Sequence, residues 1–280
     1  EKILARASGK DYAKAGDILW IKVDQAMMDD ILGPRVQISE QMELLGAKVW
    51  DSSKVTIISD HYTPPANARQ AEIVKFTREW AMKNGIENYH EFEGPCHQVM
   101  VEKGRVAPGD VVVGTDSHTC MYGALGAFST GIGSTEMVGV LATGEIWLKV
   151  PQTIRFQFEG KLSKGVMAKD VILRSIGIIG HHGATYKAIE FTGSTFDSML
   201  MDERLCVTNM AVEAGAKNGI IAYDQITKQY LDSIGVKGGH IFTSDVDAEY
   251  CESYNLRAEE IEPLCACPHE VDNVTEIKNV

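Results

Sequence analysis

The chain has 280 residues, of which 44% are hydrophobic and 24% are charged, and its formal net charge is −12 at pH 7. This mixture is typical of an ordinary globular protein and excludes a disordered or fibrous chain. Binding to nucleic acid depends on Lys and Arg side chains that neutralise phosphates, so this acidic excess argues against a nucleic-acid partner. The length predicts one large domain or two smaller ones.

No stretch of the sequence approaches the roughly 20 apolar residues that cross a bilayer, so no membrane partner is expected. The first ten residues, EKILARASGK, lack the pattern of a signal peptide and predict a charged helical turn. Six cysteines stand at positions 96, 120, 206, 251, 265 and 267, too few and too scattered for a disulfide framework. These features predict a cytoplasmic protein.

Short apolar runs alternate with helix-length segments, which predicts an α/β fold. In chain order we expect a strand at 55–59, a helix at 66–84, strands at 89–92 and 111–113, a helix that Ser134 caps and that stops before Pro151, a strand from residue 153 and a helix at 169–180. A boundary near Val150–Pro151 divides the chain into two α/β domains, 1–150 and 151–280. The last residues, PHEVDNVTEIKNV, form neither a closing helix nor a polar tail, and predict a truncated chain.

Acidic residues and histidines follow three of the expected strands directly. They are Asp60 and His61 after the first strand, His97 after the second, and Asp116 and His118 after the third. Ligands of open α/β sheets collect at the carboxyl ends of strands. A carboxylate that binds one imidazole nitrogen fixes the tautomer and makes the other nitrogen more basic, so such a pair can deliver a proton to a leaving hydroxyl. The alternative is that each histidine only caps a turn or donates a hydrogen bond to a backbone carbonyl.

Asn209 and Glu213 form a fourth candidate element. If residues 205–215 are helical, the two side chains lie four residues apart on one face and can present an amide and a carboxylate to a common ligand or to a histidine. A solvated helix face is the simpler alternative. The glycine-rich stretch before Ser134 lacks the lysine of a phosphate-binding loop and indicates close backbone packing. The His181–His182 and Cys265–Ala266–Cys267 motifs are interpreted as structural.

At residues 114–119, GTDSHT, the sequence resembles the aconitase and isopropylmalate dehydratase superfamily. The resemblance continues in SDHYTPP around His61, GPCHQV around His97, TNMAVEAGAK and ATGEIWLKVP, and it covers nearly the whole chain in the expected order. It implies a three-layer α/β/α fold, together with a swivelling domain that is often a separate small subunit.

The resemblance also implies roles for individual residues. Asp60 with His61 is similar to the pair that handles the departing hydroxyl, and His97 with Asp116 to a pair that orients substrate and water. The remaining residues similar to family site residues are Ser117 as a substrate contact, His118 paired with Glu213, and Asn209 beside them.

Family members hold a [4Fe–4S] cluster through three cysteines, in a GSCTN-type motif and a later C-x-x-C motif. Neither motif occurs in this sequence, and none of its six cysteines matches those positions. The resemblance therefore implies a chain without metal ligands of its own, which stops before the cluster-binding domain. A second departure lies at Ala26–Met27–Met28–Asp29–Asp30, where relatives carry a Gln or His near Met28 or Asp29 as a substrate contact.

Taken together, the resemblance implies the large subunit of a hydro-lyase of the isopropylmalate isomerase group, which acts on a small hydroxy-dicarboxylic acid in leucine biosynthesis. Homoaconitase and dimethylmalate dehydratase are alternatives within the class, and the apolar Met27–Met28 region favours an alkyl side group. A zinc-dependent hydrolase and a non-catalytic binding protein are alternatives from other classes.

Overall fold

The computed structural model describes residues 1–280, except for the side chain of Val36. The helices are α1 (Lys2–Ser8), α2 (Ser39–Leu44), α3 (Ala68–Lys83), α4 (Cys96–Glu102), α5 (Ser134–Thr143), α6 (Ala168–Ile179), α7 (Met201–Asn209) and α8 (Gln225–Ser233). The strands are β1 (Ile18–Lys22), β2 (Gln25–Asp29), β3 (Val55–Ser59), β4 (Tyr89–Glu91), β5 (Val111–Gly114), β6 (Phe128–Gly131), β7 (Glu145–Lys149), β8 (Thr153–Glu159), β9 (Ala188–Thr192), β10 (Asn218–Ile221), β11 (Glu252–Arg257), β12 (Leu264–Ala266) and β13 (Val274–Glu276). This is an α/β fold, as the sequence predicts.

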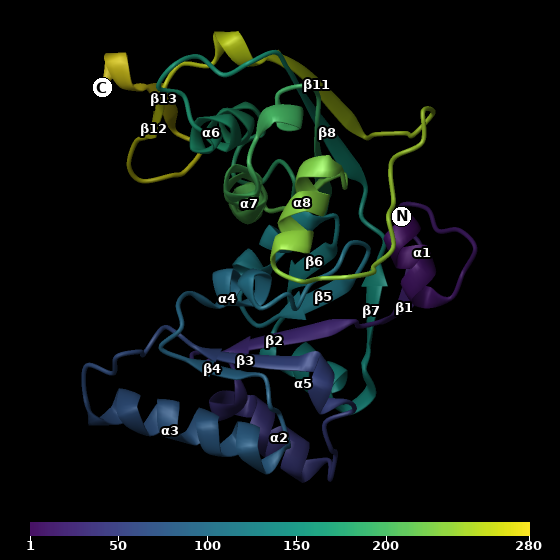
Figure 1. Ribbon diagram of the computed structural model, residues 1–280, viewed down its shortest axis with the longest axis vertical. Coiled ribbons are helices and arrows are strands. Elements are labelled where there is room, and N and C mark those ends of the chain that lie inside the picture. Colours follow the sequence, from purple (N-terminus) through teal and green to yellow (C-terminus); the bar gives the residue numbers. More distant parts are fainter.

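The first parallel sheet has the order β4-β3-β2-β5-β6 and forms the centre of three layers. Successive side chains of a strand point to opposite faces, and β2 shows this clearly. Met28 packs in the core beneath α2, α3 and α5, whereas Met27 packs in the core on the other face, beside α4 and the 3₁₀ segment Ser117–Leu125. Figure 1 shows α2, α3 and α5 along one side of this sheet and α4 along the other.

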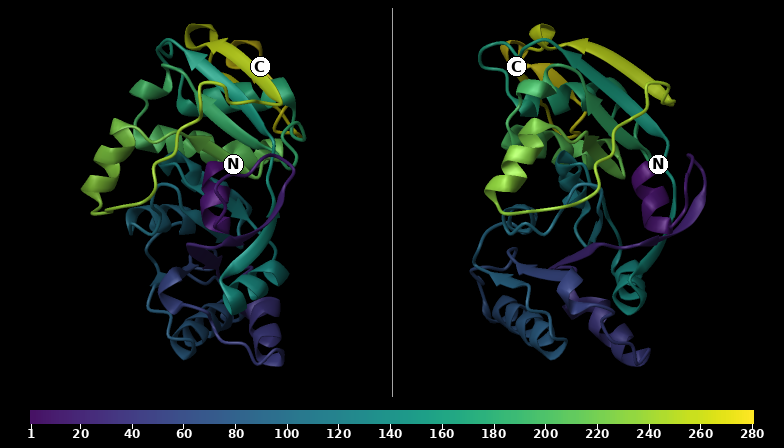
Figure 2. Two further views of the ribbon diagram at one scale, coloured as in Figure 1. Left: turned by 90° about the vertical axis from the view of Figure 1, so that its right-hand side faces the viewer. Right: turned by 45° about the vertical axis from the view of Figure 1, so that its right-hand side comes forward.

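The second parallel sheet has the order β10-β9-β8-β11. Its phenylalanines Phe156, Phe158 and Phe191 form a core with α6 and α7 on one face. The segment 239–250 runs along the molecule past the N-terminal helix α1 (Figure 2), where the ammonium of Lys2 donates to the carbonyl of Thr243 and to Asp245.

Helix α7 belongs to the second half of the chain and packs against the first half. Its Met201 and Leu205 pack with Met27 and Ile58 in the core of the first sheet. The hydroxyl of Thr208 donates to the carbonyl of Met121, in the 3₁₀ segment after β5, at 2.7 Å. The expected boundary at Val150–Pro151 falls between β7 and β8, but this packing joins the two halves closely, so the division into domains 1–150 and 151–280 stays a proposal.

Most expected elements are present within one to two residues of their predicted bounds, and two differ. The helix from Ser134 ends at Thr143, where Gly144 adopts a left-handed conformation (φ 73°) and β7 begins. The cap is also different, because Gly133 precedes the first turn and the hydroxyl of Ser134 donates to the carbonyl of Leu32 instead. The expected helix at 205–215 is α7 followed by a 3₁₀ segment, Met210–Ala214.

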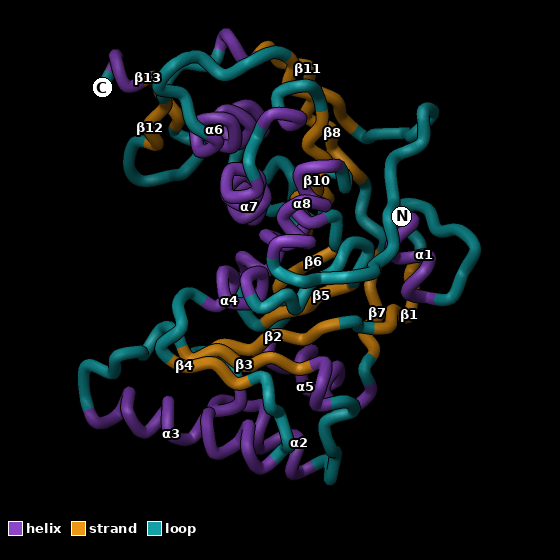
Figure 3. The backbone as a smooth tube through the Cα atoms, in the orientation of Figure 1, coloured by secondary structure: helices purple, strands orange, loops and turns teal.

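Figure 3 shows the loops that leave β3, β4 and β5 converging near α4. No helix of the described residues is both long enough and apolar enough to cross a membrane.

Candidate functional site

The first acid–histidine pair stands at the carboxyl end of β3. The imidazole Nδ1 of His61 lies 2.8 Å from Oδ1 of Asp60, and Oδ2 of Asp60 accepts a hydrogen bond of 2.6 Å from the backbone N–H of Cys96. Both carboxylate oxygens are therefore occupied, which fixes the pair against the first turn of α4. The side chain of His61 is 35% exposed, so its other nitrogen, Nε2, can reach a ligand.

Two further carboxylates surround His61. Asp30, at the end of β2, is fully buried and accepts hydrogen bonds from the backbone N–H groups of His61 and Tyr62 at 3.1 and 3.0 Å. Burial disfavours the charged imidazole, but the negative charges of Asp60, Asp29 and Asp30 outweigh burial, and the pKa of His61 is raised above its ordinary value. The surrounding carboxylates therefore stabilise the protonated form of His61.

His97 lies in the first turn of α4, and its imidazole contacts two side chains. Its Nε2 lies 2.7 Å from Oδ1 of Asp116, and its Nδ1 lies 3.0 Å from the hydroxyl of Tyr122. Burial raises the pKa of Tyr122 well above the ordinary value, so this phenol keeps its proton and donates to Nδ1. His97 then donates to Asp116 from Nε2, which fixes the tautomer of the imidazole.

Asp116 follows β5 and is held in the charged form. The hydrogen bond from His97, together with the one from the backbone N–H of His118, lowers the pKa of this carboxyl to about 2, although burial opposes the shift. Both hydrogen bonds end on Oδ1. The second oxygen is thus available to accept a hydrogen bond from a ligand.

The third histidine reaches the end of α7. The Nδ1 of His118 lies 3.1 Å from Oδ1 of Asn209 and 3.2 Å from its backbone carbonyl, and its Nε2 lies 3.7 Å from Oε1 of Glu213. The last distance is that of an ion pair rather than a hydrogen bond. Asn209 and Glu213 therefore meet His118 on one face, although Glu213 belongs to the 3₁₀ segment and not to α7 itself.

The three pairs form one continuous cluster. Asp60 binds the backbone of Cys96, the neighbour of His97, and the rings of His97 and His118 have centroids 6.4 Å apart. Gly131, at the end of β6, packs against this loop so closely that a Cβ atom there would lie 2.7 Å from the carbonyl oxygen of Asp116. The glycine-rich stretch therefore serves close backbone packing, as the sequence predicts.

Of the three remaining candidates, one is exposed and two are buried. Ser117 is exposed beside Asp116 and can face a ligand. Asp29 is buried, and its carboxylate accepts hydrogen bonds from the N–H groups of Ile31 and Leu32 and from the hydroxyl of Thr115. Met28 is 0% exposed and packs in the core on the opposite face of the sheet.

The prediction that Met28 contacts substrate is therefore wrong, because a side chain in that core has no route to the histidines. Met27 is likewise 0% exposed, so the apolar surface expected from the two methionines does not exist.

Sequence reasoning missed Asp30 and Tyr122. The short apolar run Ala26–Met28 is followed by Asp29 and then by Asp30, and an acidic pair after such a run is a pattern that could have identified Asp30. Tyr122 lies in a 3₁₀ segment whose fold the sequence pattern does not indicate, and nothing in its neighbours distinguishes it from a core tyrosine.

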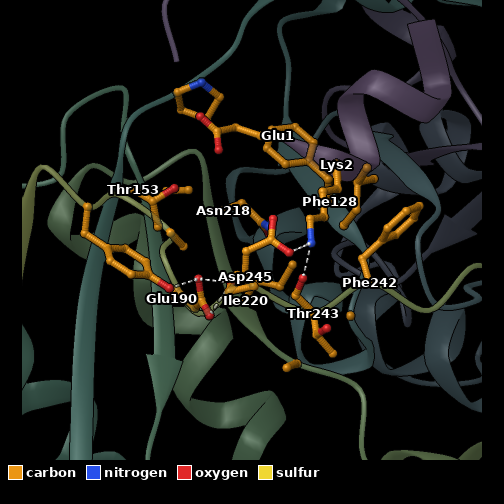
Figure 4. A pocket seen from close by; sticks show the side chains of 18 of the residues that line it. Glu1, Lys2, Phe128, Thr153, Glu190, Asn218, Ile220, Phe242, Thr243 and Asp245 are labelled. Carbon is orange, nitrogen blue, oxygen red and sulfur yellow. Dashed lines mark hydrogen bonds and ion pairs between the residues drawn. The ribbon is translucent and has the colours of Figure 1, made fainter. Parts of the chain in front are cut away.

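A separate hollow of about 400 Å³ lies between α1, the second sheet and the segment 242–250 (Figure 4). None of the histidines of the cluster lines it. Its buried carboxylate, Glu190, already accepts hydrogen bonds from the hydroxyls of Ser244 and Tyr250, at 2.8 and 3.1 Å. These contacts attach the 242–250 segment to the sheet. We therefore interpret the hollow as a result of this packing and not as a ligand site.

The cysteines of this chain do not fit a [4Fe–4S] cluster, which needs thiolate ligands around one site. Burial raises the pKa of the Cys96 thiol, and it raises that of Cys120 to about 12. Among the described residues, the group whose His, Cys, Asp or Glu donor atoms lie within 4.8 Å of one another contains Asp29, Asp30 and His61, and no cysteine.

Comparison with known proteins places the chain in a family. The model of the aconitase family (aconitate hydratase) matches residues 1–280. The chain belongs to the aconitase family. It is 46% identical over 281 residues to the probable 3-isopropylmalate dehydratase large subunit of Methanothermobacter thermautotrophicus and 47% identical over 282 residues to 3-isopropylmalate dehydratase large subunit 1 of Methanopyrus kandleri. The family and these relatives make it a hydro-lyase sequence.

These matches cover all of this chain and 67% of each of the two relatives. The 3-isopropylmalate dehydratase large subunit of Caldicellulosiruptor saccharolyticus is 45% identical, with 66% of its length covered. Among solved structures, aconitase X of Thermococcus kodakaraensis in its holo-form matches 85% of this chain and 57% of its own, with a TM-score of 0.49 and 14% identity.

Proposed function

We propose that this chain is the part of a 3-isopropylmalate dehydratase large subunit that carries the acid–base residues of the reaction, in leucine biosynthesis. The observation that supports this most directly is the convergence of three acid–histidine pairs at the carboxyl edge of one parallel sheet, in a chain about 46% identical to proteins of that name. Dehydration of a hydroxy acid removes a proton and a hydroxyl from adjacent carbons. Such a reaction needs one group that accepts a proton and one that donates it.

His61 is the proposed proton donor to the departing hydroxyl. Its Nδ1 is bound to Asp60, its pKa is raised by the surrounding carboxylates, and its Nε2 remains free for substrate. Asp30 positions it through hydrogen bonds from the His61 and Tyr62 backbone, so that the imidazole and the carboxylates hold a fixed geometry.

His97 and Asp116 are the proposed positioning pair. Tyr122 fixes the tautomer of His97, and His97 holds Asp116 so that its free oxygen can accept a hydrogen bond from a substrate hydroxyl or a water. Ser117, exposed beside this oxygen, is the proposed substrate contact.

His118 with Glu213 and Asn209 completes the proposed site. Asn209 turns Nδ1 of the imidazole toward α7, and Nε2 then lies on the side of Glu213. The Glu213 side chain is 38% exposed, so the pair can exchange a proton with substrate or with solvent.

The complete enzyme needs parts that this chain does not supply. We propose that a [4Fe–4S] cluster bound by other residues completes the site and polarises the substrate hydroxyl when present, and that a small subunit carrying the swivelling domain covers it. We place the protein in the cytoplasm, since its six cysteines are all free.

A zinc-dependent hydrolase is less well supported. Catalytic zinc sites use about three protein ligands with free donor atoms. The carboxylate oxygens of Asp29 and Asp30 already accept hydrogen bonds from the backbone or from Thr115, which leaves the Asp29–Asp30–His61 group poorly suited to a metal ion.

The proposed substrate is tested with a panel of isopropylmalate, dimethylmalate, homocitrate and citrate on the complete enzyme, with its cluster and small subunit. Isopropylmalate should give the highest kcat/KM. A higher kcat/KM with citrate or homocitrate would refute the proposed substrate and leave the hydro-lyase class intact.

A further inference from the structure

The two-stranded ribbon formed by β1 and β7 carries an exposed aromatic face. Trp20 and Trp147 lie directly opposite each other in the antiparallel register, and they are 65% and 58% exposed. Ile18, on the same face, is 68% exposed. The opposite face of the ribbon is buried in the core through Leu19 and Leu148. An exposed apolar patch that contains tryptophan often marks a surface that another protein covers.

The charged residues of this face are arranged so that the ribbon complements itself. Along β7, Glu145, Trp147 and Lys149 point outward in turn, and along β1 Ile18, Trp20 and Lys22 do so. If a second copy of the face packs on it about a two-fold axis that crosses the strands, Glu145 of each copy meets Lys149 of the other, and each Trp147 meets its counterpart.

A two-fold axis along the strands pairs Glu145 with Lys22 of the other copy instead. Packed sheets are rotated by about 30°, which displaces residues two positions from the centre by roughly 3 Å, within the reach of a lysine side chain. We infer that the β1–β7 ribbon is an isologous contact between two copies of this chain.

The size of the ribbon sets the expected strength of this contact. A five-residue strand is about 17 Å long and neighbouring strands are about 4.8 Å apart, so two strands supply much less than the roughly 800 Å² per partner of a standard interface. We therefore expect a weak, reversible dimer rather than a permanent one.

The contact leaves the proposed active site open. The ribbon leads into the amino end of β2, whereas Asp30, His61 and His118 lie beyond the carboxyl ends of the strands. Association through the ribbon therefore does not depend on the proposed function, and its failure would not affect that proposal.

Sedimentation velocity of the purified protein, from about 1 to 300 μM, tests the inference. The unaltered protein should show a monomer–dimer equilibrium, and Trp147→Ala should raise the dissociation constant about 30-fold, as for a central interface tryptophan. Glu145→Lys should also weaken the dimer at least about tenfold, because the new lysine of each copy then faces a lysine of the other copy. Glu72→Lys, at an exposed position of α3, makes the same change of charge away from the ribbon and should leave the dimer unchanged.

Mixing two variants tests the ion pairs themselves. Glu145→Lys and Lys149→Glu are each expected to dimerise more weakly than the unaltered protein, and their equimolar mixture is expected to form a heterodimer with two attractive ion pairs and to recover the lost affinity. Rescue by Lys22→Glu in place of Lys149→Glu supports the other two-fold arrangement. The inference is overturned if the unaltered protein stays monomeric, or if variants that keep the native circular dichroism spectrum dimerise like the unaltered protein, which would mean that something other than a second copy covers the ribbon.

Discussion

Replacing Asp60 by Asn tests how the carboxylate acts on His61. Asp60 uses Oδ1 for His61 and Oδ2 for the backbone N–H of Cys96. An amide has one oxygen, so if Asn keeps the Cys96 contact, its NH₂ group faces Nδ1 of His61. The imidazole can then only accept at Nδ1, and the protonated form loses a hydrogen bond to a charged group as well as a nearby negative charge.

The size of this effect follows from the hydrogen bond that is lost. A hydrogen bond to a charged group contributes about 1.5–3 kcal/mol, and each 1.4 kcal/mol is a factor of ten. Asp29 and Asp30 remain near His61, so we expect the lower part of that range, a fall in kcat of about 10–100-fold at neutral pH. The pKa of His61 should fall, because the carboxylate that raises it is gone.

Two measurements check this prediction. In the purified protein, the nuclear magnetic resonance titration of His61 should move to lower pH in Asp60→Asn, and Asp247→Asn, an exposed position away from the cluster, should leave it in place. In the complete enzyme, activity that needs protonated His61 should decline at lower pH in the variant than in the unaltered enzyme. An unchanged or higher titration midpoint for His61 would refute the reasoning.

Three further predictions follow from the same structure. His118 and Glu213 should be coupled by about 0.5–3 kcal/mol in a double-mutant cycle on kcat/KM, whereas additive effects would remove the pairing. Asp224→Ala should lower the free energy of unfolding in urea by about 3 kcal/mol, because it leaves the guanidinium of the fully buried Arg204 without its carboxylate, and a loss below about 1 kcal/mol would contradict this. The 280 residues alone should bind no stoichiometric iron and sulfide, and a brown protein containing both would overturn the cysteine argument.

The sequence predicts the elements whose patterns are local. The buried strand at 55–59 and the helix that follows it are found at β3 and α3. The sequence does not predict β7, because the run before Pro151 contains good helix formers and its alternation of buried and exposed residues becomes evident only once β1 pairs with it. Pairing between residues more than 100 positions apart overrides the local preference there.

The positions of several candidate site residues follow from the order of the strands. Asp60, His61, Asp116 and His118 follow strands directly, so the parallel order of the sheet brings them together without further information. The prediction for Met28 fails because successive side chains of a strand point to opposite faces of the sheet. A difference of one residue therefore decides whether a side chain faces the ligand or the core. The fixing of His97 by Tyr122 depends on tertiary packing that no short pattern encodes.

The most direct test of the proposed function is the rate of His61→Ala in the complete enzyme with isopropylmalate, measured alongside its iron and sulfide content. A positioned proton donor contributes about 10²–10⁴-fold to the rate, so kcat should fall by that factor while the cluster content stays unchanged. A kcat close to that of the unaltered enzyme, with the cluster intact, would contradict the assignment of His61 as the proton donor.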